Sequence, residues 1–193
     1  QYEKLASEYT RLATFFPRSP SFKRLPLTFA SGDKFKELVD AYLTNALRKG
    51  VPSLASDLNS LYTVKNRFNV LVPARDPVDV KANEKYVVVR GLVEKYLVSL
   101  KSAAASFPGS AKEETKDVVV WTEYLYASLL ELGGEYEAAL AAVENALASD
   151  PEIVDLYEKK GRVLKLLGDL PAAAQCLDAG RVKDLADRYI NNK

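Results

Sequence analysis

The sequence VWTEYLYASLLELGGEYEAALAAVENALASDP, residues 120–151, is followed by a related sequence, VDLYEKKGRVLKLLGDLPAAAQCLDAGRVKDL, at residues 154–185. Corresponding positions lie 34 residues apart, and small or apolar residues recur in both copies. The matched pairs are Ala127 and Gly161, Leu130 and Leu164, Gly134 and Gly168, Ala139 and Ala173, and Ala146 and Gly180. Small residues let two helices cross closely, and glycine breaks the chain between helices. A glycine near the middle of each copy therefore predicts two helices per copy, and Pro151 ends the first copy.

A period of 34 residues built from two helices is the spacing of tetratricopeptide repeats. Each such unit buries its apolar face only by stacking on its neighbours, so the repeats form a solenoid that acts as a scaffold. We therefore predict an all-α protein, a tetratricopeptide-type helical-repeat solenoid of antiparallel helix pairs in a right-handed superhelix.

The remaining sequence is divided by its apolar spacing and its prolines. A broad apolar stripe over residues 35–47 predicts a helix. Pro17, Pro20 and Pro26 are expected to exclude a regular helix between residues 14 and 32. The predicted segments are a degenerate helical-repeat segment (1–65), a loop or insertion with a short extended piece (66–83), a long helix and linker (84–116), and two tetratricopeptide repeats plus the start of a third (117–193).

Composition excludes several catalytic chemistries. The chain has no histidine and one cysteine, Cys176, which excludes histidine-based triads, Cys-rich zinc sites and an internal disulfide. The nucleotide-binding motifs G-x-G-x-x-G and G-x-x-x-x-G-K-[ST] do not occur in the sequence. We predict no catalytic, cofactor-binding or metal-binding residues, and we interpret Cys176 as a buried apolar side chain in a cytosolic or nuclear protein. No apolar run approaches the roughly 18 residues of a membrane span, so no membrane partner is expected.

The charge is unevenly placed along the chain. Residues 1–75 contain 12 Lys and Arg against 6 Asp and Glu, whereas residues 111–193 contain 10 against 16. The basic excess is concentrated at Arg11, Arg18, Lys23, Arg24, Lys34 and Lys36. Such an asymmetry favours an anionic partner for the first third, for example rRNA phosphates on a ribosome. The alternative is an ordinary solvated surface, or pairing with the acidic last third.

Several stretches that the generic repeat pattern does not require are more specific. They are residues 24–36 (RLPLTFASGDKFK), 49–52 (KGVP), 60–62 (SLY), 92–102, Trp121 with the tyrosines that follow it, and 186–191 (ADRYIN). Together they resemble the large auxiliary subunit of the N-terminal acetyltransferase A (NatA) complex, over nearly the whole chain. The segment Phe68–Asn83 departs from the family pattern and resembles an insertion.

In that family the subunit is a helical-repeat ring that holds the catalytic acetyltransferase subunit near the ribosomal exit tunnel. The resemblance implies a non-catalytic, cytoplasmic scaffold segment that links the catalytic subunit to the ribosome for co-translational N-terminal acetylation. It also implies a small inhibitory partner and an inositol polyphosphate, whose neighbourhood would include Arg188 and Lys193. Because the chain lacks an initiator methionine and its ends resemble incomplete repeats, an internal segment of a longer protein is expected.

A second function remains open on the sequence alone. A free-standing tetratricopeptide adaptor would bind peptides in its concave groove. The best-known peptide clamp of this repeat uses Lys and Asn at positions 5 and 9 of the first helix. Those positions hold Tyr124 and Ser128 in one repeat and Glu158 and Arg162 in the next, so that clamp is missing.

The chain is expected to transfer no acetyl group. Acetyltransferases of the NatA catalytic superfamily hold the cofactor pyrophosphate with [RQ]-x-x-G-x-[GA], and no glycine here has Arg or Gln three residues before it. Incubation of the pure chain with labelled acetyl-CoA and a peptide starting with Ser should give only background transfer. Turnover that survives rigorous purification would contradict the scaffold interpretation.

Overall fold

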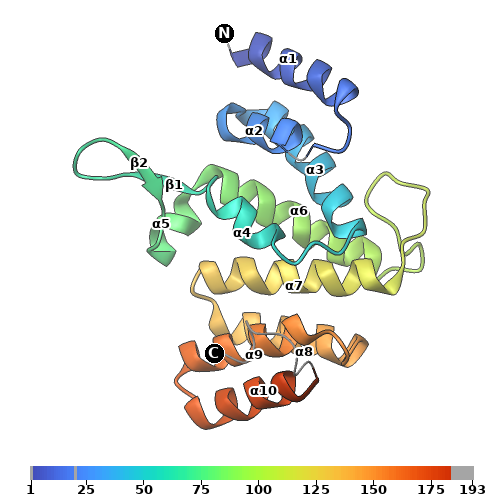
Figure 1. The fold of residues 1–193 in the computed structure, drawn as a ribbon, viewed down its shortest axis with the longest axis vertical. Helices are drawn as coiled ribbons and strands as arrows, with labels where there is room; N and C mark the ends of the chain where they lie inside the picture. The colour runs from blue at the N-terminus through green and yellow to red at the C-terminus, as the bar shows by residue number, and fades with distance from the viewer. Residues whose placement is uncertain (1, 20, 184–193) are drawn as a thin grey trace.

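The computed structural model describes residues 2–19 and 21–183, and these form a stack of helices from which one small hairpin projects (Figure 1). The predicted all-α helical-repeat architecture is confirmed. The described elements are α1 (Tyr2–Phe15), α2 (Ser21–Phe29), α3 (Gly32–Arg48), α4 (Leu54–Asn59), β1 (Thr63–Lys65), β2 (Leu71–Pro73), α5 (Pro77–Ala82), α6 (Glu84–Leu100), α7 (Lys116–Leu132), α8 (Tyr136–Ser149), α9 (Val154–Leu167) and α10 (Leu170–Lys183).

The two repeats seen in the sequence form the helix pairs α7–α8 and α9–α10. Ala127 and Ala139 are fully buried in the same apolar cluster. A Cβ atom on Gly161 would lie 2.6 Å from the Leu177 side chain of α10, so only glycine allows this approach. The other small repeat residues are also buried, namely Ala146, Ala173 and Gly180.

Glycine turns the chain between the helices of each repeat. Gly134 and Gly168 have φ angles of +75° and +88°, in the left-handed region that side chains disfavour. The N–H of Gly168 donates to carbonyls at the end of α9, which satisfies groups that the helix leaves unpaired. Pro151 is exposed between α8 and α9, where it separates the two repeats.

The long helix α6 is fastened to the first repeat by polar contacts. The Tyr86 hydroxyl donates to the Leu129 carbonyl at 2.8 Å, inside the core. Arg90 forms a two-pronged ion pair with Glu135 at the start of α8. The guanidinium of Arg90 holds the pKa of the Glu135 carboxyl below its usual value, so this pair stabilises the fold at neutral pH and weakens as the pH falls through the lowered pKa.

The first half is built around α3 and α6. The predicted stripe of α3 is buried, and its inward residues are Phe35, Val39, Leu43 and Leu47. They share one apolar cluster with inward side chains of α4, α6 and α7. The degenerate helical pair and the first repeat are therefore parts of one continuous core.

Gly50 and Trp121 meet where the α3–α4 turn contacts α7. Gly50 has a φ angle of +58°, and a Cβ atom there would lie 2.6 Å from the Trp121 indole nitrogen. The indole also packs edge-on against Tyr124, with ring centroids 5.6 Å apart. Two stretches that carried the family resemblance are thus in direct contact.

The expected absence of helix between residues 14 and 32 is wrong, because α2 occupies residues 21–29 with Pro26 inside it. Pro26 gives up one helical hydrogen bond, but it is buried with Leu27 while α2 packs against both α1 and α3. The Lys85 Nζ atom donates to the carbonyls of Leu27 and Thr28, at 2.6 and 2.8 Å. Tertiary contacts therefore hold a short helix that proline alone disfavours.

The loop expected over residues 66–83 is partly wrong, because α5 occupies residues 77–82, whereas the short extended piece expected there overlaps β2. Pro73 is the last residue of a strand at an open sheet edge, and Pro77 is the first residue of α5. Both positions tolerate a residue without an N–H group. The Asp76 carboxylate caps α5 by accepting the Val78 N–H at 2.8 Å.

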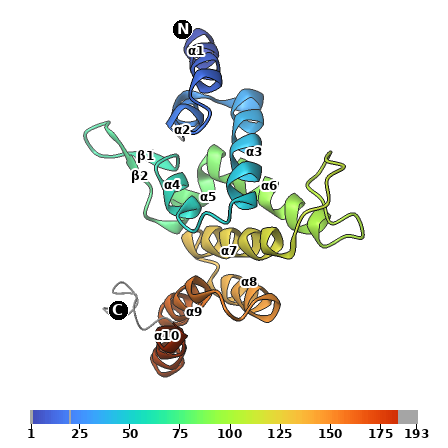
Figure 2. The same ribbon diagram turned by 45° about the vertical axis from the view of Figure 1, so that its right-hand side comes forward.

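The strands β1 and β2 form an antiparallel hairpin, with Val64 opposite Val72. The residues that flank it are adjacent in the core, because the Ala74 N–H donates to the Tyr62 carbonyl at 2.7 Å and both residues are buried. The hairpin extends away from the helices between these fixed ends (Figures 1 and 2).

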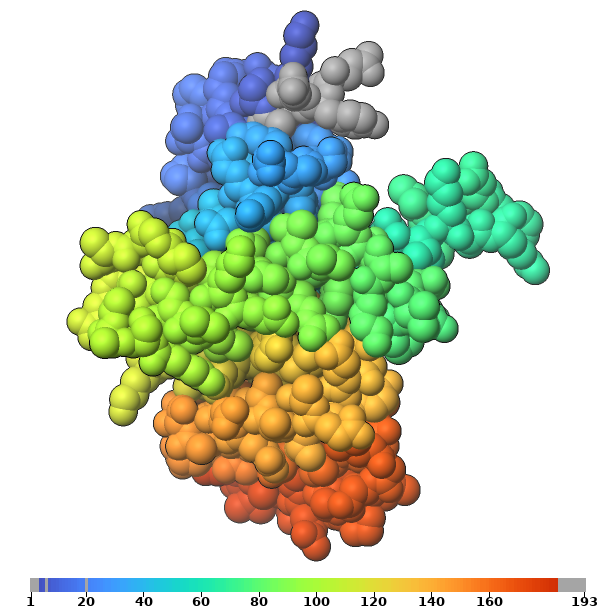
Figure 3. All heavy atoms as spheres, turned by 180° about the vertical axis from the view of Figure 1, so that it is seen from behind, coloured from blue at the N-terminus to red at the C-terminus, as the bar shows by residue number. Residues whose placement is uncertain are grey.

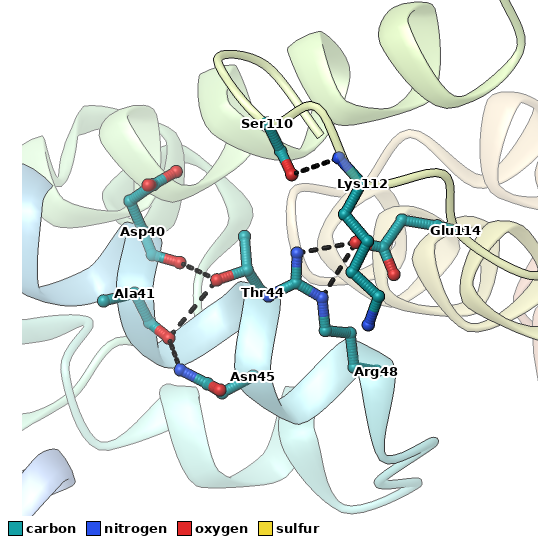
Figure 4. Close-up of polar contacts among 8 residues, drawn as sticks. All are labelled: Asp40, Ala41, Thr44, Asn45, Arg48, Ser110, Lys112 and Glu114. Atoms are coloured by element: carbon teal, nitrogen blue, oxygen red, sulfur yellow. Dashed lines mark hydrogen bonds and ion pairs between the residues drawn. The ribbon is translucent and has the colours of Figure 1, made fainter. Parts of the chain in front are cut away.

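The linker between α6 and α7 is held against the end of α3 (Figure 4). Both the Nε and Nη2 atoms of Arg48 donate to one Glu114 carboxylate oxygen, at 2.8 and 2.6 Å. Arg48 also lies 5.1 Å from the ring of Phe107, which is buried edge-on against Tyr96. The α6–α7 linker is therefore held in place by contacts with the end of α3 and with the core.

Gly50→Ala is expected to destabilise the protein strongly. A left-handed backbone costs a Cβ-bearing residue about 1–2 kcal/mol, and overpacking against the indole adds about 1–3 kcal/mol. Gly109→Ala is the matched control, because Gly109 also has a positive φ (+76°) but a Cβ there meets nothing within 4 Å. Urea unfolding should separate the two variants. Equal losses of unfolding free energy would show that the contact with Trp121 contributes nothing.

Candidate anion-binding pocket

Three of the six basic residues singled out in the sequence are paired with neighbouring carboxylates. The pairs are Arg11 with Glu8 at 2.9 Å, Lys34 with Glu37 at 2.9 Å, and Arg24 with Asp57 at 3.1 Å. Exposed pairs of this kind add little stability. They do place a negative charge beside each cation, which weakens its attraction for an external anion.

Two others, Arg18 and Lys23, lie together with Lys49 around a pocket of about 300 Å³. The three cations come from the α1–α2 turn, from α2 and from the end of α3. All three are exposed, and none forms an ion pair with a residue in the described ranges. Lys36, the sixth predicted residue, is exposed on α3 and does not line this pocket.

The pocket also presents hydroxyl groups, from Ser19, Ser53 and Tyr42. Its one carboxylate, Asp57, is engaged by the Arg24 guanidinium and by the Ser53 hydroxyl, which donates at 3.5 Å. The pocket therefore keeps a positive excess, because its single acid is already partnered.

Burial raises the pKa of the Tyr42 hydroxyl, and the nearby Asp57 carboxylate raises it further, while Arg24 lowers it. Tyr42 therefore stays protonated at neutral pH and can donate a hydrogen bond. Lysine and arginine cations with hydroxyl donors form the set that recognises phosphate oxygens or a carboxylate. The pocket is suited to a small oxyanion or to one phosphate of a larger molecule.

Sequence reasoning missed Lys49. It precedes Gly50 in the KGVP stretch, far along the chain from Arg18 and Lys23. Only the packing of α2 against α3 brings these residues to one pocket. No helical period relates Lys49 to Arg18 and Lys23 in the sequence. The one feature that could have drawn attention to Lys49 is its place in a stretch with family resemblance.

A second pocket of about 300 Å³ lies between α4, α7 and α9. Its cations serve the protein itself, because the buried Glu131 carboxylate accepts from Lys159 at 2.9 Å and from Arg162 at 2.5 Å. The Lys159 Nζ atom also lies 5.3 Å from the Tyr124 ring centre. Ser128 is buried, and its hydroxyl donates a hydrogen bond to the Tyr124 carbonyl. This groove thus offers no carboxylate clamp at the positions that other repeats use.

The remaining predicted sites give no further cluster. Cys176 is only partly buried, which differs from the prediction of a buried side chain. Its thiol donates to the Tyr157 carbonyl at 3.4 Å, and burial raises its pKa, as expected of an unreactive side chain. Within residues 2–19 and 21–183, no group of three or more acidic or cysteine side chains could hold a metal ion. Over the same ranges, every helix is too short or too polar to cross a membrane. Arg188 and Lys193 lie outside the described residues.

Comparison with protein families gives one clear match. The model of the family "N-terminal acetyltransferase A, auxiliary subunit" matches residues 1–75 and 80–193. Of the segment interpreted as an insertion, only residues 76–79 fall outside the match.

Individual relatives agree with the family model. The chain is 37% identical over 196 residues to the auxiliary subunit NAA15 of the N-terminal acetyltransferase A complex of Arabidopsis thaliana, covering 100% of the chain and 19% of that protein. It is 31% identical to the human NatA auxiliary subunit N-alpha-acetyltransferase 16, covering 96% of the chain and again 19% of the relative. The chain therefore spans about a fifth of the length of these relatives.

A solved structure has the same fold. The structure of Naa15/Naa10 bound to HypK-THB matches 99% of this chain and 25% of its own, with a TM-score of 0.78 and 32% sequence identity. The resemblance found in the sequence is therefore confirmed, and the chain belongs to the family of auxiliary subunits of the N-terminal acetyltransferase A complex.

Proposed function

We propose that this chain is a non-catalytic scaffold segment that helps to hold the catalytic subunit of a NatA acetyltransferase. The observation that carries this proposal is the match of the entire chain to auxiliary subunits, one of which was solved with Naa10 and HypK-THB. The catalytic partner would correspond to Naa10, and a HypK-like protein is the proposed small inhibitory partner.

The internal contacts support a scaffold over a free peptide adaptor. Glu131 uses the cations of Lys159 and Arg162 to join α7 to α9, instead of leaving them for a ligand. Arg90 joins α6 to α8 in the same way through Glu135. Because the cations of this groove already form ion pairs inside the protein, the groove is better suited to a rigid support than to binding varied peptides.

We also propose that the basic pocket around Arg18, Lys23 and Lys49 contacts phosphates of ribosomal RNA, which would link the scaffold to the ribosome in the cytoplasm. The support for this is the positive excess of the pocket and its hydroxyl donors. An inositol polyphosphate beside Arg188 and Lys193 stays a further proposal from family resemblance.

The scaffold proposal is tested by purifying the complete natural protein, tagged, from its own cells. An acetyltransferase should be recovered in an amount equal to that of the tagged protein. The same tag on an unrelated helical-repeat protein is the control. A broad set of peptide-bearing clients without an acetyltransferase would instead support the adaptor.

The ribosome proposal predicts different outcomes for two variants of equal charge change. Lys23→Glu with Lys49→Glu alters the pocket, whereas Arg11→Glu with Lys34→Glu alters cations that already have carboxylate neighbours. Co-sedimentation with ribosomes should fall for the pocket variant at low salt and stay near wild type for the other. Wild-type binding should weaken steeply as salt rises, since phosphate contacts release counterions. Equal sedimentation of all three proteins at low and moderate salt would remove the pocket from consideration.

A further inference from the structure

The β1–β2 hairpin is a separate projection on the molecule. Seen from behind, it forms an isolated knob beside the helical body (Figure 3). Its register places Lys65 opposite Leu71, and both are exposed. The partly buried pair Val64 and Val72 occupies the other face, where Val64 packs against the core. One face and the tip of the hairpin are therefore accessible.

The tip of the hairpin has a defined conformation. The Asn66 side-chain oxygen accepts the N–H groups of Phe68 and Val70, at 2.9 and 3.0 Å. The Asn66 N–H donates to the Val70 carbonyl at 2.9 Å, and Asn69 completes the turn with a φ of +61°. Phe68 is thus presented on an ordered turn, which lowers the entropy lost when it binds a partner.

The chemistry of the tip is basic and apolar. Phe68 is 69% exposed, and the Arg67 guanidinium lies 4.7 Å from its ring centre. Lys65 adds a second exposed cation at the end of β1 next to the tip, and Arg75 is exposed at the base of the hairpin, after β2. None of these cations forms an ion pair with a described residue, and the sequence has no Asp or Glu anywhere between Asp57 and Asp76.

We propose that the hairpin binds single-stranded RNA, with one unpaired base stacked on Phe68 and the neighbouring phosphates held by Lys65 and Arg67. Stacking on an aromatic ring combined with cations along the backbone is how proteins hold single strands without reading their sequence. Two cations beside the tip and a third at the base of the hairpin, with no carboxylate between them in the sequence, complement a polyanion, whereas an apolar protein partner would have no use for that charge.

This inference does not depend on the scaffold proposal, because it is tested with free RNA and without ribosomes or an acetyltransferase. The assay measures fluorescence anisotropy of a labelled 12-nucleotide single-stranded RNA with the complete natural protein. It is performed in the Lys23→Glu, Lys49→Glu background, so that the basic pocket cannot supply the binding. The same RNA as a duplex is measured in parallel.

Phe68→Ala should raise the Kd by about ten-fold, the effect of losing one stacked base. Phe68→Trp should retain the wild-type Kd. Lys65→Glu with Arg67→Glu should reduce the slope of log binding constant against log salt by about 1.4, since each lost phosphate contact accounts for about 0.7. The single strand should bind more tightly than the duplex, because only an unpaired base can stack on the ring.

The matched control is Lys95→Glu with Val98→Ala on α6, which removes an exposed cation and an apolar side chain that is 76% exposed. It should leave the Kd at the wild-type value. Thermal unfolding of every variant checks that the fold is intact. An unchanged Kd in Phe68→Ala, or equal affinity for duplex and single strand, would overturn the inference. So would loss of a bound protein from the hairpin variants while their RNA affinity stays that of wild type.

Discussion

The contact between Gly50 and the Trp121 indole is the constraint on which the stack depends. It brings the α3–α4 turn onto α7 at a distance that excludes any side chain at residue 50. The same indole supports Tyr124, whose ring lies beneath the Lys159 cation. That cation in turn pairs with Glu131, so one run of contacts connects the degenerate first half to the second repeat.

Ionic contacts at the junctions fix how the helices align. A buried carboxylate such as Glu131 pays a desolvation cost that its partners largely cancel, so the pair adds little net stability. Removing one partner, however, would leave a charge stranded in the core. Arg90 and Glu135 are only partly buried, but their ion pair fixes the alignment where α6 meets the first repeat. Apolar burial therefore drives the stacking, and these pairs favour one alignment of the helices over its neighbours.

The sequence predicted what local spacing determines. The 34-residue period located both repeats and their glycine turns, because small and apolar residues recur at the same positions of both copies. Pro26, Pro73 and Pro77 misled the interpretation, since proline is tolerated in a packed helix, at a sheet edge and at a helix start. Lys49 was missed because its pocket arises from tertiary packing. By contrast, Arg11 lies three residues after Glu8 in a predicted helix, so their pairing could have been predicted from the sequence.

The hairpin begins and ends at one point of the core, where the backbones of Tyr62 and Ala74 are hydrogen-bonded. A segment inserted between two such neighbours does not change the spacing of the helices on either side. Its length and chemistry can therefore diverge among lineages while the helical framework stays constant. The family model matches the whole hairpin, and the side chains on its exposed face can change in this way without any change in the packing of the core.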